Sequence, residues 1–407
     1  MKRLCVVMVV LAFACGPAKP AISSASQTPS PTAVAAVASA GTTPSPVASG
    51  SPSPQPTTSG QLLFAVLEAK GTTNAFQRNT VAIAGLDGYA RAKTTFTPMP
   101  LPWVGCAGAV LPASAQVAAG KVYFADGTGT VRSLSVNGQL SVVTTFALTS
   151  SQQMLSFAVS PDGSRLMGAI FTIPPKPASG DPCGSGAPMF APGNFTLDTY
   201  SASSGGVSKL LSHQVLPTSS AAPVPNVMAL LGWDFVGPLG TYPTAWATQG
   251  GGPHHYNGFP VRVDATTGKV LNQVDSACTV EDIAATGDYA CFPVVPSGAA
   301  PAVSVRRPDG SEIWRVAVQS NDSLYLAYVS PDEQRVFTLS STSQVLGRDS
   351  SHTTVSSNFS FDGWINSGTV IGGGYTANLT YVSLTSPATI VDLGFKGLFI
   401  GTVAGGG

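Results

Sequence analysis

The chain has 407 residues with 20 basic and 20 acidic side chains, and charged residues make up only 10% of it. Three basic residues and no acidic one precede position 61, so residues 61–407 carry 20 − 3 = 17 basic and 20 acidic groups, a net charge of −3. That balance excludes a protein held to nucleic acid by phosphate neutralisation. Beyond the N-terminus there is no apolar run of about 18 residues, so no ordinary membrane-spanning helix is predicted.

Residues 1–14 have the pattern of an export signal. Lys2 and Arg3 form a positive start, an apolar stretch too short to span a membrane follows, and small residues precede a cleavage site after Ala14. The motif LAFAC, which ends at Cys15, resembles a bacterial lipoprotein lipobox. The resemblance implies that Cys15 is diacylated, which supplies a membrane anchor. The alternative is the same cleavage without lipid, which gives a secreted protein.

Residues 15–60 are expected to act as a linker behind that cysteine. From position 17 onward this segment is rich in Pro, Ser, Thr and Ala, with no aromatic residue and a single charge, Lys19. Such a composition cannot bury a core, so we expect a disordered tether with polyproline II character. The predicted location is therefore extracytoplasmic, on a lipid-anchored chain at the cell membrane.

A strand–turn–strand unit recurs through residues 61–407. The segments FAVSPDGSRLMGAIF at 157–171 and LAYVSPDEQRVFTLS at 326–340 both place a Ser-Pro-Asp turn and a basic residue between apolar runs. Tight turns of a second kind, such as SVNGQL at 135–140 and RPDGSEI at 307–313, alternate with the first kind. Asn-Gly and Asp-Gly supply the positive φ that hairpins need. Two alternating turn types are typical of four-stranded blades and predict an all-β fold, a β-propeller.

Six blades are predicted at 98–147, 153–216, 226–275, 278–320, 323–357 and 358–395. A further blade combines three strands of 61–97 with a lone C-terminal strand at 395–403, so the N- and C-terminal strands close the ring. The predicted count is seven blades, with six or eight as alternatives. A two-sheet sandwich or two small β-domains are the other arrangements that such turns allow.

The repeat pattern resembles that of TolB-like and other WD-repeat-like bacterial propellers. The resemblance covers 61–407 and implies the propeller fold, with little consequence for function.

Four cysteines lie in the predicted propeller: Cys106, Cys183, Cys278 and Cys291. An even number in an exported chain predicts two disulfides, for which three connectivities are possible. Two of the four, Cys106 and Cys183, fall in long loops of neighbouring blades, so we expect them to pair and leave Cys278 to pair with Cys291. None belongs to a CxxC motif or a histidine cluster, so no metal site is predicted.

Binding residues are expected on the propeller rim that carries the long connections. Connections between strands b and c, and from strand d to the next blade, emerge on one face, whereas the tight a–b and c–d turns lie on the other. The long predicted loops are 98–108, 171–193, 216–226, 248–258 and 293–301. Long irregular loops on one rim are the usual place for binding residues.

The candidate site residues come from these loops and from the predicted innermost strands. Trp103 lies in the first loop, and His254, His255 and Tyr256 lie in the fourth. The two histidines are candidate ligand or metal contacts, and solvated side chains of a Gly-rich loop are the alternative.

Three further candidates, Trp233, Asp234 and Asp282, are predicted on innermost strands, where they could line the central channel and hold a ligand. The alternative is that they satisfy neighbouring backbone amides.

Catalytic signatures are missing from the sequence. It contains no G-x-S-x-G elbow, no H-E-x-x-H motif, no P-loop and no dinucleotide fingerprint, and only four histidines. We therefore expect a binding or scaffold module for a protein, peptide or glycan at the cell envelope, without a cofactor. The alternatives are a propeller hydrolase or lyase with a carboxylate or metal site in the channel, and a structural envelope protein with no discrete ligand.

Overall fold

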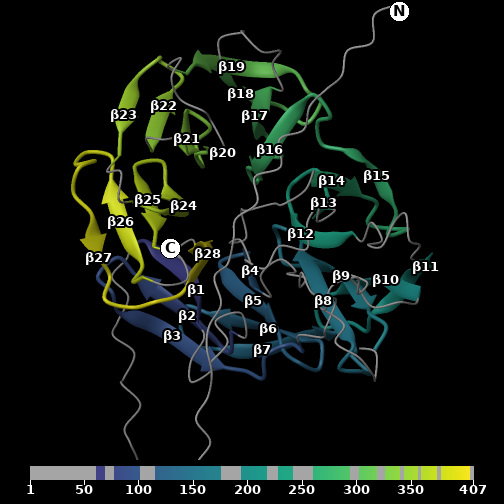
Figure 1. Ribbon diagram of the computed structural model, residues 1–407. Helices are drawn as coiled ribbons and strands as arrows, with labels where there is room; N and C mark the ends of the chain where they lie inside the picture. Colours follow the sequence, from purple (N-terminus) through teal and green to yellow (C-terminus); the bar gives the residue numbers. More distant parts are fainter. Residues whose placement is uncertain are drawn as a thin grey trace, which may run out of the picture. The chain divides into compact units, whose positions relative to one another are not determined.

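The computed structural model describes residues 61–68, 78–100, 115–175, 194–217, 228–241, 260–293, 302–318, 326–339, 343–355, 359–373 and 377–403. These residues form 28 strands, arranged as seven four-stranded antiparallel sheets. Within the described ranges there is no helix, and therefore no helix that is long and apolar enough to cross a membrane. The chain is a seven-bladed β-propeller (Figure 1).

The four strands of each blade are lettered from the innermost, a, to the outermost, d. Blade 1 contains β28 (Leu398–Val403), β1 (Leu63–Glu68), β2 (Thr80–Gly85) and β3 (Ala90–Thr95). Blade 2 contains β4 (Ala115–Ala118), β5 (Lys121–Ala125), β6 (Thr130–Ser135) and β7 (Leu140–Thr145). Blade 3 contains β8 (Gln153–Val159), β9 (Arg165–Thr172), β10 (Asn194–Ser203) and β11 (Lys209–Pro217).

Blade 4 contains β12 (Ala229–Trp233), β13 (Pro238–Thr241), β14 (Pro260–Val263) and β15 (Val270–Gln273). Blade 5 contains β16 (Cys278–Ile283), β17 (Tyr289–Pro293), β18 (Ala302–Arg306) and β19 (Glu312–Ala317). Blade 6 contains β20 (Leu326–Val329), β21 (Arg335–Leu339), β22 (Gln344–Gly347) and β23 (His352–Thr354). Blade 7 contains β24 (Phe361–Asn366), β25 (Thr369–Gly372), β26 (Thr380–Ser383) and β27 (Val391–Asp392).

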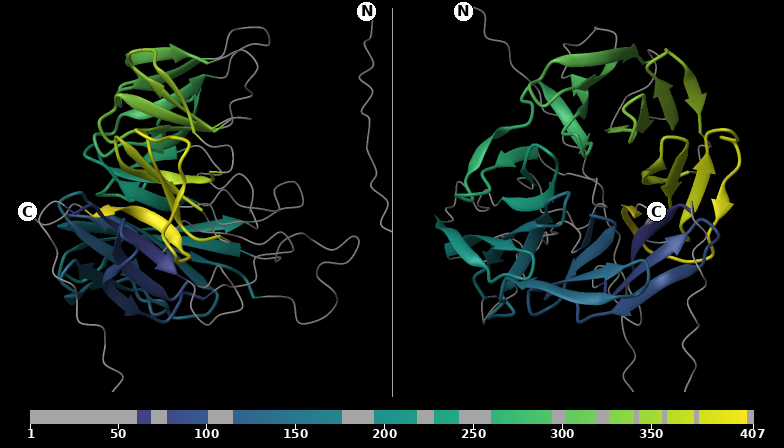
Figure 2. Two further views of the ribbon diagram at one scale, coloured as in Figure 1. Left: turned by 90° about the vertical axis from the view of Figure 1, so that its left-hand side faces the viewer. Right: turned by 180° about the vertical axis from the view of Figure 1, so that it is seen from behind.

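Both ends of the described chain close the ring, as predicted. The C-terminal β28 pairs antiparallel with β1, with Leu67 opposite Leu398 and Leu63 opposite Val403. It is the innermost strand of blade 1, because it contacts β24 on one side and β4 on the other. Figure 2 shows the blades as a ring in its right-hand view. Closure of this kind leaves no open array of blades and pairs the first and last strands with each other.

Burial along the strands explains why the sequence reads as short apolar runs. The inner strands lie between neighbouring blades and are buried on both sides, so β2 is buried along its whole length. A strand buried on both faces requires a continuous apolar run. The outer strands have one free edge, and β15 and β27 are largely exposed. Between these extremes, β10 alternates buried and half-buried residues, the pattern of a strand with one face on the core.

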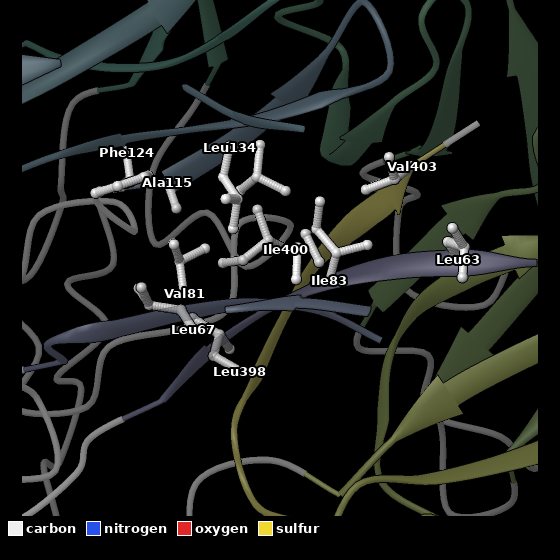
Figure 3. Close-up of a cluster of buried hydrophobic side chains, with 13 residues drawn as sticks. Leu63, Leu67, Val81, Ile83, Ala115, Phe124, Leu134, Leu398, Ile400 and Val403 are labelled. Carbon is white, nitrogen blue, oxygen red and sulfur yellow. The ribbon is translucent and has the colours of Figure 1, made fainter. Parts of the chain in front are cut away.

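The core consists of apolar layers between adjacent blades. Between blades 1 and 2, Leu67 and Ile400 lie in one cluster with Phe124 and Leu134, all of them buried (Figure 3). The ring of Phe124 also contacts that of Phe96, with 4.9 Å between their centroids. Each such side chain contributes about 1.5–3 kcal/mol when it leaves water.

The Ser-Pro-Asp turns are built by local hydrogen bonds. In blade 3 the hydroxyl of Ser160 donates to Asp162 at 2.5 Å and accepts from the backbone N–H of Arg165 at 2.9 Å. Gly163 follows with φ of 72°, a backbone conformation that glycine adopts without a steric penalty. The turn is therefore built by Ser and Asp at these places and favours Gly after them, which is why the motif can be recognised in the sequence.

The predicted disulfide between Cys278 and Cys291 is present and joins strands a and b of blade 5, with 5.2 Å between the Cα atoms. In the register of these strands Val280 lies opposite Cys291, so the bond is diagonal. The other predicted pair, Cys106 and Cys183, lies outside the described residues.

Candidate functional site

The structure describes three of the seven ligand-contact candidates named from the sequence. Trp103, His254, His255 and Tyr256 lie outside the described residues, so their part in binding stays a prediction. Trp233 ends the innermost strand of blade 4, and Asp282 lies on the innermost strand of blade 5, as predicted.

The prediction that Asp234 lies on an innermost strand is wrong. Strand β12 ends at Trp233, and Asp234 begins the a–b turn of blade 4. Its carboxylate accepts hydrogen bonds from the backbone N–H groups of Val236 and Gly237, at 2.8 and 2.9 Å. An Asp side chain that binds the backbone two and three residues on favours a turn over a continued strand, which is the physical reason for the difference.

A pocket of about 620 Å³ opens on the face of the tight turns, between blades 3 and 4. Blade 3 lines it with its Ser-Pro-Asp turn and Arg165, and blade 4 with its turn from Trp233 to Pro238. Strands c and d of blade 4, the turn between them and Pro308 of blade 5 complete the lining. The pocket therefore combines Trp233 and Asp234, and it lies on the face opposite the predicted long-loop rim.

A buried ion pair underlies the pocket. One guanidinium nitrogen of Arg262, on β14, donates to both carboxylate oxygens of Asp234 at 2.7 and 2.6 Å. The two side chains are only 10% and 3% exposed. The pair joins strand c of blade 4 to its a–b turn, so it holds the backbone that carries the neighbouring side chains of the pocket.

An arginine that lies over a tryptophan ring forms the wall between the blades. The guanidinium carbon of Arg165 lies 4.9 Å from the centre of the Trp233 ring, within the range of a cation–π contact. Arg165 is exposed and Trp233 is half-buried. Because the two residues belong to different blades, the contact bridges blades 3 and 4.

Exposed apolar side chains stand beside this wall. Phe235 is 72% exposed, Leu271 is 62% exposed, and Val236 is also exposed. The backbone N–H of Phe235 donates to the carbonyl of Ala285 in blade 5 at 2.8 Å, which fixes the turn while its side chain faces solvent. Large apolar side chains gathered at one place on a surface mark an interaction site more often than isolated ones do.

Two acidic side chains of the pocket, Asp162 and Asp264, accept hydrogen bonds from their own turns. Hydrogen bonds from the Ser160 hydroxyl, then from the backbone and hydroxyl of Ser164, lower the pKa of Asp162 to about 2. The Thr266 hydroxyl and backbone lower the pKa of Asp264 in the same way. Within the described residues, the guanidinium of Arg165 has no acceptor at hydrogen-bond distance. Arg165 is therefore an exposed cation of the pocket that is available to a ligand.

A second ionisable cluster lies between blades 5 and 6, also on the tight-turn face. Burial, a hydrogen bond to Glu333 and the charge of Glu333 raise the pKa of Asp288 to about 6. Glu333 accepts a hydrogen bond from the Thr286 hydroxyl at 2.6 Å and has a positive φ of 57°. It occupies the place of Gly163 in the other Ser-Pro-Asp turn, so a carboxylate has replaced a glycine where glycine is the favoured residue.

A third cluster surrounds the disulfide in blade 5. Asp275 accepts hydrogen bonds from the Tyr289 hydroxyl at 2.8 Å and from Arg306 at 3.1 Å. Burial, then the hydrogen bond to Asp275, raises the pKa of Tyr289. Asp275 lies near the sulfurs of Cys278 and Cys291, but these are bonded to each other and are not thiolate ligands. The cluster is accounted for by hydrogen bonding within blade 5.

Comparisons with known proteins concern the fold. No protein-family model matches the chain, and no curated protein does. Similar solved structures include an oligogalacturonate lyase in complex with manganese, with 7% identity, a TM-score of 0.45 and coverage of 81% of this chain and 90% of that one. They also include the oligogalacturonate lyase of Vibrio parahaemolyticus, with 10% identity, a TM-score of 0.43 and coverage of 77% and 83%. A TolB-type protein of Agrobacterium tumefaciens has 13% identity, a TM-score of 0.31 and coverage of 82% and 88%.

The likeness is one of fold. The similar structures also include a Dos1 propeller, with 12% identity, a TM-score of 0.40 and coverage of 84% of this chain and 86% of that one. At these identities none of them assigns a site to this chain.

Sequence reasoning missed Arg165, Phe235 and Leu271 as parts of one site. A signal for Phe235 is present, because the a–b turn of blade 4 reads WDFVGP where other blades have polar turns such as SPDG and ATGD. An apolar pair at the tip of a solvent-facing turn contradicts the usual turn composition. No comparable local signal marks Arg165, because the same residue type follows the turn in both Ser-Pro-Asp copies.

Proposed function

We propose that this protein is an exported binding module that holds a protein or peptide partner at the cell envelope through the pocket between blades 3 and 4. The observation that carries the proposal is the exposed Phe235, next to a pocket walled by Trp233 and Arg165. Aromatic residues and arginine in a concave site are the residue types that dominate the energetics of protein interfaces.

The apolar side chains favour a peptide over a glycan. Phe235 offers an aromatic face to either, but Val236 and Leu271 are aliphatic and exposed beside it. A complex is stabilised when aliphatic side chains are buried against other apolar groups. A peptide supplies such groups more readily than the hydroxyl-rich surface of a sugar does. A glycan in place of a protein or peptide partner would contradict the proposal.

Attachment to the membrane belongs to the same proposal. The LAFAC motif supports cleavage before Cys15 and lipidation of that residue, and the Pro-rich linker to position 60 supports a tethered propeller. Replacement of Cys15 by Ala should release the protein from the membrane fraction. Wild-type protein that is recovered entirely in the medium would contradict the anchor.

One observation favours an enzymatic alternative. The pKa of Asp288 is raised to about 6 beside Glu333, and a carboxyl group that titrates near neutral pH is suited to general acid–base chemistry. The pair lies outside the lining of the pocket, however, so the binding proposal does not depend on it. A hydrolase or lyase activity that is lost in Asp288→Asn would support the enzyme.

Photo-cross-linking from the pocket in intact cells tests the binding proposal. Benzoylphenylalanine at position 235 should capture one discrete partner. Benzoylphenylalanine at Val142, an exposed residue on the outer strand of blade 2, serves as the matched control and should not capture it. Equal capture from both positions, or none from position 235, would contradict the proposal.

A further inference from the structure

We propose that the pocket recognises a short acidic–apolar peptide segment, in which a carboxylate binds Arg165 and a neighbouring apolar side chain packs on Phe235 and Leu271. This inference rests on the proposed function and names the chemistry of its partner.

The two Ser-Pro-Asp turns show that Arg165 departs from its repeat. The equivalent arginine of blade 6, Arg335, donates from its guanidinium to the carbonyl of Ser367 in blade 7. That hydrogen bond ties adjacent blades together, and Arg335 is half-buried. In blade 3 the same position of the motif is exposed, and within the described residues Arg165 donates no side-chain hydrogen bond. The fold therefore does not need the hydrogen-bonding capacity of Arg165, which leaves it for a ligand.

The contact with Trp233 is not a hydrogen bond, so it leaves the N–H donors of Arg165 available. The 4.9 Å contact thus positions the arginine without consuming its donors. A side chain held in place before binding loses less conformational entropy when the ligand arrives.

The pocket lining holds three carboxylates, Asp162, Asp234 and Asp264, and two guanidinium groups, Arg165 and Arg262. Within the described residues none of these carboxylates lies at hydrogen-bond distance from Arg165. Arg262 is neutralised by Asp234 beneath the pocket, and this pair is buried. Asp162 accepts hydrogen bonds from Ser160 and Ser164 in its own turn. Arg165 is thus the cation of the pocket that a ligand can neutralise, and a carboxylate matches its fork of donors with two parallel hydrogen bonds.

The apolar part of the ligand is specified by Phe235 and Leu271. Both side chains are more than half exposed, and they come from the a–b turn and strand d of blade 4 respectively. Pro161 and Pro308 add apolar surface from blades 3 and 5. An aromatic or aliphatic side chain that enters between them would cover surface that the fold leaves in water.

Selection from a phage library of randomised linear peptides on the whole exported protein tests this inference. The selected peptides should combine Asp or Glu with a neighbouring Phe, Trp, Leu or Ile. Their affinity should fall at least about tenfold in Arg165→Ala and in Phe235→Ser. The variant Arg165→Lys should lose most of the affinity as well, because lysine keeps the charge but lacks the planar fork.

Arg315→Ala is the matched control, because Arg315 is an exposed arginine on the outer strand of blade 5 that pairs with Glu312. This variant should bind the selected peptides like the wild type. Unchanged thermal unfolding of each variant shows that a lost affinity does not come from a lost fold.

The outcomes separate this inference from the proposed function. Selected peptides that lack acidic residues but still require Phe235 would overturn the acidic class and leave the peptide-binding function standing. Selected basic peptides would overturn the role of Arg165 in the same way. If neither Phe235 nor Arg165 affects any selected peptide and the cross-link at position 235 also fails, the proposed function itself is wrong. Binding of acidic oligosaccharides in place of peptides would overturn both.

Discussion

The guanidinium of Arg262 contacts both carboxylate oxygens of Asp234, at 2.7 and 2.6 Å, and both side chains are at least nine-tenths buried. Through this pair, strand c of blade 4 holds the a–b turn that presents Phe235 to solvent. The backbone N–H groups of Val236 and Gly237 bind the same carboxylate. One carboxylate therefore organises the turn, the ion pair and the shape of the pocket.

Asp234→Ala should destabilise the propeller by about 3–5 kcal/mol, because it leaves the Arg262 charge buried without a partner. Chemical denaturation of the two proteins measures the loss. Glu312→Ala, which breaks the exposed pair with Arg315, is the control and should cost less than about 1 kcal/mol. A similar small cost for both variants would show that the buried pair has no special role. Replacing Arg262 by Met in the Asp234→Ala background should recover part of the stability.

The raised pKa of Asp288 predicts that the free energy of unfolding falls as the pH rises. Its pKa is raised from 3.8 to about 6 in the folded protein, so between these values the folded state binds more protons than the unfolded state. The stability that Asp288 contributes should therefore be fully present below the unfolded pKa and fall as the pH rises through about 6. The charges that face Asp288 are those of Glu333, Asp309 and Arg307.

Melting temperature as a function of pH measures this effect, with Asp288→Asn as the comparison. The difference between wild type and variant should change between about pH 4 and 7 and stay constant above that range. Glu333→Gly restores the glycine found in the blade 3 turn and removes the neighbouring charge, so it should reduce the slope. A wild-type slope that persists in both variants would assign the effect to other groups.

Removal of the disulfide should weaken blade 5. The variant with Ala at both Cys278 and Cys291 should lose about 2–4 kcal/mol, since the bond closes a short loop in the unfolded chain, with a sequence separation of 13. Reduced wild-type protein should unfold with the same midpoint as the double variant. An oxidised and a reduced wild type of equal stability would be incompatible with a structural bond at this site.

Two glycines in strands should respond differently to an added methyl group. A Cβ at Gly372 would overlap the backbone carbonyl oxygen of Ser360, which forces the backbone to move. Gly372→Ala should therefore destabilise the protein by about 3 kcal/mol, the upper part of the range for overpacking. Gly232 has nothing within 4 Å of its Cβ position, and Gly232→Ala should be close to neutral. Equal melting temperatures for the two variants would mean that blade 7 has room for a methyl group at Gly372.

The propeller fold can be predicted from the sequence because its turns are made locally. Ser160, Asp162 and Gly163 build their turn with contacts inside a few residues, and the same chemistry recurs at Ser330 and Asp332. The spacing of such turns is enough to divide 61–407 into blades and to assign the closing strand. The even number of cysteines and their positions along the chain predict the disulfide between Cys278 and Cys291, which joins strands a and b of blade 5.

The pocket cannot be predicted in the same way because it depends on contacts between blades. Arg165 and Trp233 meet only after blades 3 and 4 have packed, and neither residue carries a sequence signal for the other. Asp234 is expected on a strand because it follows an apolar run, but its hydrogen bonds to the next backbone amides turn the chain. The pocket thus depends on packing between blades and on hydrogen bonds from side chains to the backbone, and the sequence repeats predict neither of these.

The position of the ligand can be measured directly by hydrogen–deuterium exchange of the protein with and without a selected peptide. Binding in the pocket should slow exchange in the backbone of 160–165, 233–238 and 262–272, which come from blades 3 and 4. Protection confined to the predicted long loops, 171–193 and 248–258, would place the ligand on the opposite rim and contradict the pocket as the binding site.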